Sequence, residues 1–173
     1  MAKGRVDFHL IVSTLSPFKK IDLAVQLFNK TGKYLIIIGA GSHFDYLRKI
    51  AAHNVVMMGW QEDKVVQEYL QNCRAFIFPG EEDFGIAPVE AMACGKPVLA
   101  YGKGGALETI VPGVTGELFY EPTVASMEDA LGRMIVNEPN YDPQKIRKHA
   151  EKFSQEQFVE RWREILKKIN FLK

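Results

Sequence analysis

Residues 34–39 read Tyr34-Leu35-Ile36-Ile37-Ile38-Gly39, an apolar run that no charged side chain interrupts before the closing glycine. A strand with one face in water alternates polar and apolar residues, whereas a strand covered on both faces does not. The run therefore predicts a strand buried inside a parallel sheet. Similar short runs recur along the chain at residues 8–12, 55–58, 75–78, 98–100 and 117–120.

Helical patterns occupy the segments between these runs, and the connections are only a few residues long. We expect helices over residues 21–28, 46–51, 62–72 and 87–93. Parallel strands that alternate with helices demand right-handed crossovers. The sequence therefore predicts an α/β fold, with a Rossmann-like doubly wound parallel sheet over about residues 8–120. The whole chain, residues 1–173, is expected to form a single domain.

The pattern changes after Gly116, where extra C-terminal helices are expected at about residues 125–136, 143–152 and 154–170. The last helix carries apolar residues spaced i, i+4, i+7, i+8 and i+11, with charged residues between them. Such a stripe is typical of a core or docking face, and a membrane-surface helix is the alternative. The stripe consists of Phe158, Trp162, Ile165, Leu166 and Ile169.

The composition is that of a globular protein. Of 173 residues, 47% are hydrophobic and 25% are charged, and 22 Lys and Arg balance 21 Asp and Glu. A net charge of +1 argues against a nucleic-acid binder that relies on a general basic field. No apolar run approaches the roughly 18 residues of a transmembrane helix. Residues 1–6 lack the apolar core of a signal peptide.

The cysteines and histidines follow no metal-binding or redox pattern. Cys73 and Cys94 have no CxxC spacing, and the four histidines lack the spacing of metal ligands. We therefore expect reduced thiols, no zinc site and a cytoplasmic location. A disulfide between the two cysteines is the alternative.

The candidate site is expected at one edge of the sheet, because ligands of open α/β sheets bind outside the carboxyl ends of the strands. Five loops would meet there. They hold most of the chain's glycine and many of its charged loop residues. The loops are residues 13–20, 39–43, 59–62, 79–86 and 101–106.

The loop Gly39-Ala40-Gly41-Ser42 follows a strand and opens a helix, as a dinucleotide-binding fingerprint would. Phe44 stands where the third glycine belongs, and the next strand ends at Met58-Gly59 without a following acid. Both departures disfavour a nicotinamide-dependent dehydrogenase. A tight turn is favoured over a direct phosphate contact.

The acidic loop Glu81-Glu82-Asp83 precedes a helix start that contains Gly85 and Pro88. Glycine permits close backbone approach, and proline suits the first helical turn. Free backbone N–H groups of residues 85–87 would make an anion site that the helix dipole strengthens. Glu90, about one turn inside this helix, can reach the same pocket. The alternative is a solvated acidic loop followed by an exposed Glu90.

Lys19 and Lys20 lie in the first strand-to-helix loop, at the same edge of the sheet. A solvated lysine pair is the ordinary interpretation. Together with the anion-binding helix start, however, the two cations could hold a diphosphate from both sides. Carboxylates accept hydrogen bonds from sugar hydroxyls. A nucleotide sugar satisfies both requirements.

The same residues carry a family resemblance. Residues 78–98 contain the spacing Glu82-x7-Glu90, and this segment resembles the signature of the retaining glycosyltransferases of family 4. Residues 15–23, 101–109 and 113–116 also match. The similarity covers about residues 8–135. Within the family, the sequence most resembles bacterial mannosyltransferases of polysaccharide biosynthesis. The resemblance implies the C-terminal half of a GT-B fold, which binds the nucleotide-sugar donor.

The resemblance also implies roles for individual residues. Glu82 would bond the donor sugar and Lys19 the diphosphate, and these two would serve catalysis. Glu90 would hold the ribose. The donor would be a nucleotide-diphosphate sugar, GDP-mannose being favoured, and no metal cofactor is implied. The other implied substrate-binding residues are Thr14, Lys20, Gly59, Trp60, Gln61, Phe84, Gly85, Ile86 and Ala87.

Two departures from the family stand out. The family usually has an arginine, paired with the lysine on the diphosphate, where this chain has Thr14. Loss of such a charge-assisted contact costs about 1.5–3 kcal/mol of binding. The chain also has room for only one of the two domains of such enzymes, so the acceptor-binding N-terminal domain is an expected partner. A peripheral contact of the full-length enzyme with the cytoplasmic membrane face is left open.

Two other classes of function compete with donor binding. A glycosidase also needs paired carboxylates, but hydrolysis of a neutral sugar needs no anion site at a helix start. A degenerate, non-catalytic domain could bind a partner chain, with Thr14 as the mark of lost chemistry. The base cannot be assigned, because its contacts are expected from backbone near residues 59–61. The sequence does not identify the acceptor. The sugar of the donor could be glucose or galactose instead of mannose.

Overall fold

The computed structural model describes residues 7–169 and contains one six-stranded parallel sheet in the order β3-β2-β1-β4-β5-β6. Strand β1 pairs with β2 on one side and with β4 on the other, so the order reverses between β1 and β4. This confirms the predicted doubly wound fold. The strands are β1 (Phe8–Val12), β2 (Tyr34–Ile38), β3 (Val55–Gly59), β4 (Ala75–Phe78), β5 (Val98–Tyr101) and β6 (Gly116–Phe119).

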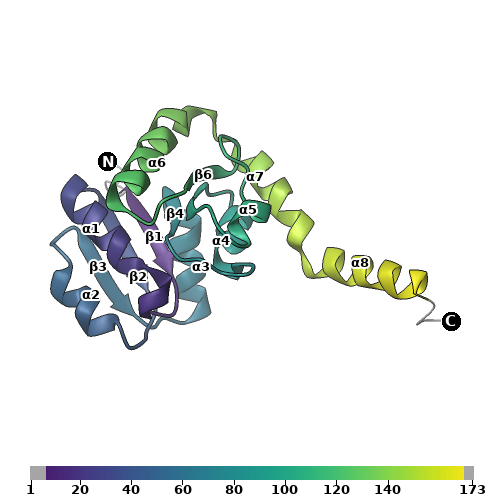
Figure 1. Ribbon diagram of the computed structural model, residues 1–173, viewed down its shortest axis with the longest axis horizontal. Coiled ribbons are helices and arrows are strands. Elements are labelled where there is room, and N and C mark those ends of the chain that lie inside the picture. The colour runs from purple at the N-terminus through teal and green to yellow at the C-terminus, as the bar shows by residue number, and fades with distance from the viewer. Residues whose placement is uncertain (1–6, 170–173) are drawn as a thin grey trace.

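Helices cover both faces of the sheet (Figure 1). One face packs against α1 (Ile21–Thr31), α2 (Phe44–Ile50) and α6 (Val124–Asn137). The other face packs against four helices and their apolar residues. These are α3 (Asp63–Asn72), α4 (Ile86–Ala93), α5 (Ala106–Thr109) and α7 (Pro143–Ala150). Short 3-10 turns precede α1 at η1 (Pro17–Lys19) and flank α7 at η2 (Glu138–Asn140) and η3 (Glu151–Phe153).

Burial on both faces explains the unbroken apolar runs. Successive side chains of a strand point to opposite faces, and in β1 Leu10 and Ile11 lie in different core clusters, both almost inaccessible. Phe76 and Ile77 divide between the two clusters in the same way. A polar residue at either kind of position would lose its hydration, which is why these strands do not alternate.

The predicted element types hold, with shifts of one to three residues at several ends. Strand β6 begins at Gly116 and ends before Tyr120, which is exposed. The four-residue helix α5 was not predicted, because one turn leaves no periodic pattern to detect. Within residues 7–169, no helix has the length and apolar content needed to cross a bilayer. Cys73 and Cys94 are both free thiols, so the disulfide alternative is wrong.

The final helix does not lie in the core, which was one of the roles predicted for it. Helix α8 (Gln155–Lys168) extends away from the rest of the chain in Figure 1 and buries none of its residues. Phe158, Trp162 and Ile165 are all exposed. A core role within this chain is therefore wrong, since α8 has no sheet face to cover. Residues 1–6, the signal-peptide position, and residue 170, the predicted helix end, lie outside the described residues.

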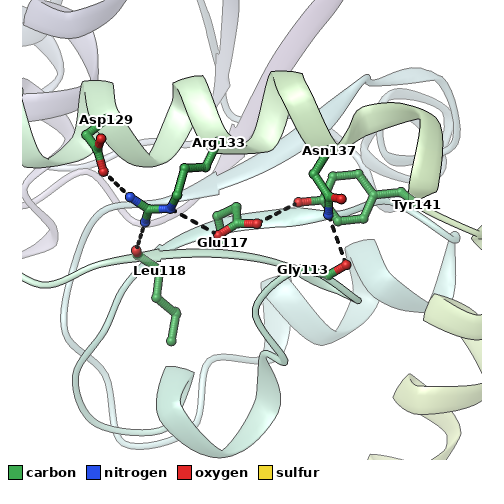
Figure 2. Close-up of polar contacts among 7 residues, drawn as sticks. All are labelled: Gly113, Glu117, Leu118, Asp129, Arg133, Asn137 and Tyr141. Atoms are coloured by element: carbon green, nitrogen blue, oxygen red, sulfur yellow. Dashed lines mark hydrogen bonds and ion pairs between the residues drawn. The ribbon is translucent and has the colours of Figure 1, made fainter.

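A buried acid ties β6 to the C-terminal helices (Figure 2). Glu117 is almost inaccessible. Its carboxylate lies 3.4 Å from Arg133 Nε and accepts a hydrogen bond of 3.3 Å from the Tyr141 hydroxyl. Arg133 also donates to the Leu118 carbonyl, at 2.7 Å, and pairs with Asp129. Burial, the largest cause, raises the pKa of Tyr141 to about 12, so this hydroxyl stays a donor.

Replacing Arg133 by Met should lower the free energy of unfolding by about 2 kcal/mol. The change leaves a buried carboxylate without its cation, and a lost charged hydrogen bond costs about 1.5–3 kcal/mol. Urea denaturation measures the effect. Asp129→Asn is the matched control: it removes the exposed partner of the same arginine and should cost under about 0.5 kcal/mol. Equal losses in both variants would contradict this account.

Buried His9 makes the stability depend on pH. Burial, the largest cause, lowers the pKa of His9 from 6.5 to about 4, although a 3.4 Å hydrogen bond from Nδ1 to the Tyr34 carbonyl opposes the shift. The unfolded chain therefore binds the extra proton first as pH falls. Stability should be full above about pH 6.5 and should fall by up to about 3 kcal/mol towards pH 4.

Substitution of His9 by Gln should flatten this part of the stability profile, which urea denaturation at a series of pH values measures. His53→Gln provides the control, because His53 is exposed. If the two variants had the same slope between pH 4 and pH 6.5, His9 would not be its source.

Candidate functional site

The reversal of strand order brings the loops after β1 and β4 together at the carboxyl edge of the sheet. Gly80 shows how close they are: a Cβ built on it would lie 3.0 Å from both Cα and the carbonyl oxygen of Lys19. Real Cβ atoms rarely tolerate such contacts with backbone. A glycine at this position therefore lets the two loops pass each other.

The two predicted catalytic residues meet at this crossing. Lys19 Nζ lies 2.5 Å from Glu82 Oε1, and the side chains are only 16% and 29% exposed. The ammonium also lies 5.0 Å from the ring centroid of Phe18. Partial burial strengthens the pair relative to a fully solvated one, because water screens it less. In the free domain, the cation and the carboxylate that the resemblance assigns to the donor thus neutralise each other.

Two glycines after β5 hold the acidic loop in place. The Gly105 amide donates to the Glu82 carbonyl at 2.8 Å. A Cβ on Gly105 would lie 2.4 Å from the Asp83 carbonyl oxygen, and one on Gly104 would lie 2.3 Å from that of Glu82. Gly104 also has φ +56°, which favours glycine. The loops after β4 and β5 are therefore in direct backbone contact.

Helix α4 begins at the same edge and points its N-terminus there. Gly85 precedes the helix with φ +81°. The first N–H groups of an α-helix have no partner within the helix. Among residues 7–169, those of Ile86 and Ala87 donate to no other acceptor either. Pro88, in the first turn, needs no donor. The helix start thus presents free donors and the positive end of the helix dipole.

A cleft of about 890 Å³ opens beside these loops, between α3 and α4. Its apolar lining residues include Val12, Ile38 and Leu70. The predicted residues Thr14, Trp60, Gln61 and Glu90 all line it. Lys19, Glu82 and the start of α4 do not, so the site has two parts that share one edge of the sheet.

Glu90 and Asp63 both line this cleft. Burial, the larger cause, and the charge of Asp63 both raise the pKa of Glu90 above its ordinary value. Gln61 is held in place, because its Nε2 donates to the Met58 carbonyl at 2.9 Å. The Gly59 carbonyl accepts a 2.9 Å hydrogen bond from the Gly39 amide, which leaves Gly59 in a structural role between β2 and β3.

Two other predicted residues lie at the margin. Lys20 is exposed and adopts φ +52° at the N-cap of α1, and none of the contacts within residues 7–169 involves its ammonium. Phe84 packs edge-on against Phe153, with 5.9 Å between ring centroids. The structure therefore brings Lys19 and Glu82 together but gives Lys20 no comparable neighbour.

The turn at residues 39–43 makes close backbone contacts with the loop after β1, which support its interpretation as a tight turn. A Cβ on Gly39 would lie 1.8 Å from the Ser13 carbonyl oxygen, and one on Gly41 would lie 2.2 Å from that of Leu15. The His43 amide donates back to the Leu15 carbonyl at 3.0 Å. These glycines admit the backbone of the neighbouring loop on one side, while Gly39 and Ala40 also line the cleft.

Sequence reasoning missed several polar residues of the cleft. Asp63, Lys64 and Gln67 line it from α3, and Ser13 lines it beside Thr14. Their positions in the sequence could have indicated them. Helix α3 begins directly after the loop at residues 59–62, and Asp63 and Gln67 share one face of it because they are four residues apart. Sequence alone did not indicate that this face meets α4.

A doubly wound parallel sheet with a cleft at the reversal of its strand order defines a ligand-binding α/β domain of the Rossmann-like class. Comparison with known families identifies the family within this class. The family described as "Glycosyl transferases group 1" matches residues 3–166. The chain belongs to this family.

Individual relatives agree with this assignment. Alpha-1,3/1,6-mannosyltransferase ALG2 of Dictyostelium discoideum is 39% identical over 107 residues, which are 60% of this chain and 25% of that protein. The apo structure of the lipopolysaccharide outer core galactosyltransferase WaaB matches 90% of this chain and 47% of its own, with TM-score 0.77 and 26% identity. Anabaena Alr3699/HepE in complex with UDP and glucose matches 97% and 49%, with TM-score 0.71 and 26% identity.

The chain spans about half, or less, of the length of each of these three proteins. The six-stranded sheet and its flanking helices match the C-terminal domains of GT-B glycosyltransferases.

The ion pair of Lys19 and Glu82 should contribute measurably to stability. A double-mutant cycle with Lys19→Met and Glu82→Gln should give a coupling energy of about 1 kcal/mol, which 1 M NaCl reduces. Lys30 and Glu128 offer a matched control, since their atoms are also 2.5 Å apart but the side chains are 60% and 37% exposed. Their coupling should be smaller, and the reverse order would contradict a shielded pair.

Proposed function

We propose that this chain is the donor-binding part of a hexosyltransferase that uses a nucleotide-diphosphate sugar. One observation carries the proposal: a shielded lysine, a carboxylate and a helix start with free N–H groups converge at one sheet edge, beside a cleft lined by a second carboxylate. A diphosphate needs the cation and the N–H donors, and sugar and ribose hydroxyls need the carboxylates. A glycosidase would need neither the cation nor the free N–H donors.

The assignments follow from these positions. Lys19 and the N–H groups of residues 85–87 would bind the diphosphate, Glu82 the donor sugar and Glu90 the ribose. Because Lys19 is paired with Glu82 at 2.5 Å, donor binding requires the ammonium to exchange this carboxylate for a diphosphate oxygen. Glu82 is then free to accept hydrogen bonds from the sugar. Thr14, which lines the cleft, adds a neutral hydroxyl where the family usually has an arginine.

Transfer would proceed with retention of configuration, as in glycosyltransferases of family 4. The acceptor oxygen bonds to the anomeric carbon on the face that the nucleotide leaves, while the bond between that carbon and the diphosphate oxygen breaks. The departing diphosphate takes the acceptor's proton. Fixed donors around the leaving group stabilise its growing negative charge. Lys19 and the start of α4 supply that charge stabilisation without a metal ion.

The whole reaction would need more than this chain. Since the chain covers about half of each matched structure, we propose that an N-terminal domain supplies the acceptor site. Relatives named as mannosyltransferases support a mannosyl donor, and GDP-mannose is the favoured substrate. We place the full enzyme in polysaccharide biosynthesis, in the cytoplasm or at the cytoplasmic membrane face.

Calorimetric titration with GDP, UDP and ADP, in the presence of EDTA, tests the donor site. One nucleotide should bind without metal, and Lys19→Ala and Glu90→Ala should each weaken it about 10- to 100-fold, since each removes a contact to a charged group.

Lys49→Ala and Glu68→Ala are the matched controls, because both side chains are exposed and lie outside the cleft. They should bind like the unaltered protein. A folded sample that binds none of the three nucleotides would refute the proposal and favour a non-catalytic domain that binds a partner chain.

A further inference from the structure

The loop that carries Glu82 and leads into α4 packs against a segment from much later in the sequence. The ring of Phe84 meets the ring of Phe153 edge-on, with 5.9 Å between their centroids. Phe153 is the last residue of η3, the turn that follows α7, and α7 itself packs against α4. At the last residue of α4, Arg147 Nε donates to the Ala93 carbonyl at 3.0 Å. The segment from α7 to η3 therefore accompanies α4 from its end back to the loop before its start.

His149 connects this aromatic contact to α5. Its ring lies edge-on to that of Phe153, with 5.6 Å between centroids, and its Nε2 lies 2.9 Å from the Thr109 carbonyl oxygen. A carbonyl only accepts hydrogen bonds, so Nε2 carries the hydrogen and donates it. His149 is partly buried, and it contacts both η3 and the last residue of α5.

A second route leads from His149 to the same loop. The hydroxyl of the buried Thr109 donates to the Gly105 carbonyl at 2.9 Å. The Gly105 amide in turn donates to the Glu82 carbonyl at 2.8 Å. The loop is thus held at Glu82 by way of α5 and at Phe84 by way of η3. His149 is the residue that both routes share.

The sequence of the loop explains why support from outside matters. Three consecutive acids at residues 81–83 repel one another, and the Gly85 that follows adopts φ +81°, where glycine is free to move. Phe84 is the one apolar side chain between these acids and Gly85, and it is partly exposed. Its contact with Phe153 gives the loop an apolar attachment to the C-terminal part of the chain.

We propose that His149 and Phe153 are positioning residues of the donor site, an inference that rests on the proposed function. Neither is assigned to the donor itself, and both act through the loop at residues 82–85. This loop decides where the Glu82 carboxylate and the free N–H groups at the start of α4 stand relative to each other. A displacement of about 1 Å in such positioned groups is costly.

The test combines calorimetry with urea denaturation on the full 173-residue chain. GDP, UDP and ADP are compared with the corresponding monophosphates. Phe153→Leu and His149→Leu should each weaken the diphosphate that binds by about 2- to 10-fold, the equivalent of one aromatic pair or one hydrogen bond. The matching monophosphate should lose less, because the ribose contact with Glu90 does not pass through this loop. The double variant should lose less than the product of the two factors, since both residues belong to one network.

Phe153→Tyr keeps the ring and should bind like the unaltered protein. The matched controls are Phe158→Leu, which alters an exposed residue of α8 that contacts Trp162, and His53→Leu, which alters an exposed histidine. Both should leave every affinity unchanged. If Phe153→Leu does not fold, Phe84→Leu removes the same contact from the side of the loop.

Unchanged affinities in the variants, or equal losses for diphosphate and monophosphate, would mean that these residues only stabilise the fold. The donor site would stand in that case. Failure of every nucleotide to bind the folded, unaltered chain would overturn the proposed function, and this inference with it.

Discussion

The pairing of β1 with β2 on one side and β4 on the other determines where every part of the site lies. Crossovers on the two sides of this reversal run in opposite directions, so the loops after β1 and β4 are left adjacent with no helix between them. The rest of the sheet holds these two loops in place, because both faces of the sheet are buried under helices. Lys19 and Glu82, 63 residues apart in sequence, meet only because of it.

Glycine makes the crowded edge possible. Gly80, Gly104 and Gly105 each stand where a Cβ would press on backbone of a neighbouring loop. Gly39 and Gly41 do the same around the loop after β1. The loops therefore support one another through backbone contacts, and polar side chains are free to face the cleft.

The ion pair at the crossing links electrostatics to ligand binding. Lys19 and Glu82 satisfy each other in the free domain, which avoids leaving either charge unpaired in a partly buried position. Under the proposed function, a diphosphate with an attached sugar would offer each of them a replacement partner. Asp63 and Glu90 differ from this pair, because both are acids that line the cleft and the charge of Asp63 helps to raise the pKa of Glu90.

The sequence by itself determined the strands, most helices and the loops that hold the site, because hydrophobic periodicity is a local property of the chain. It also marked Glu82, Glu90 and Lys19 through their setting. Only the tertiary structure decided that Lys19 pairs with Glu82, that α8 covers no part of the sheet, and that Asp63 shares a cleft with Glu90. These facts depend on which helix faces pack together, and periodicity along one segment contains no information about its neighbours in space.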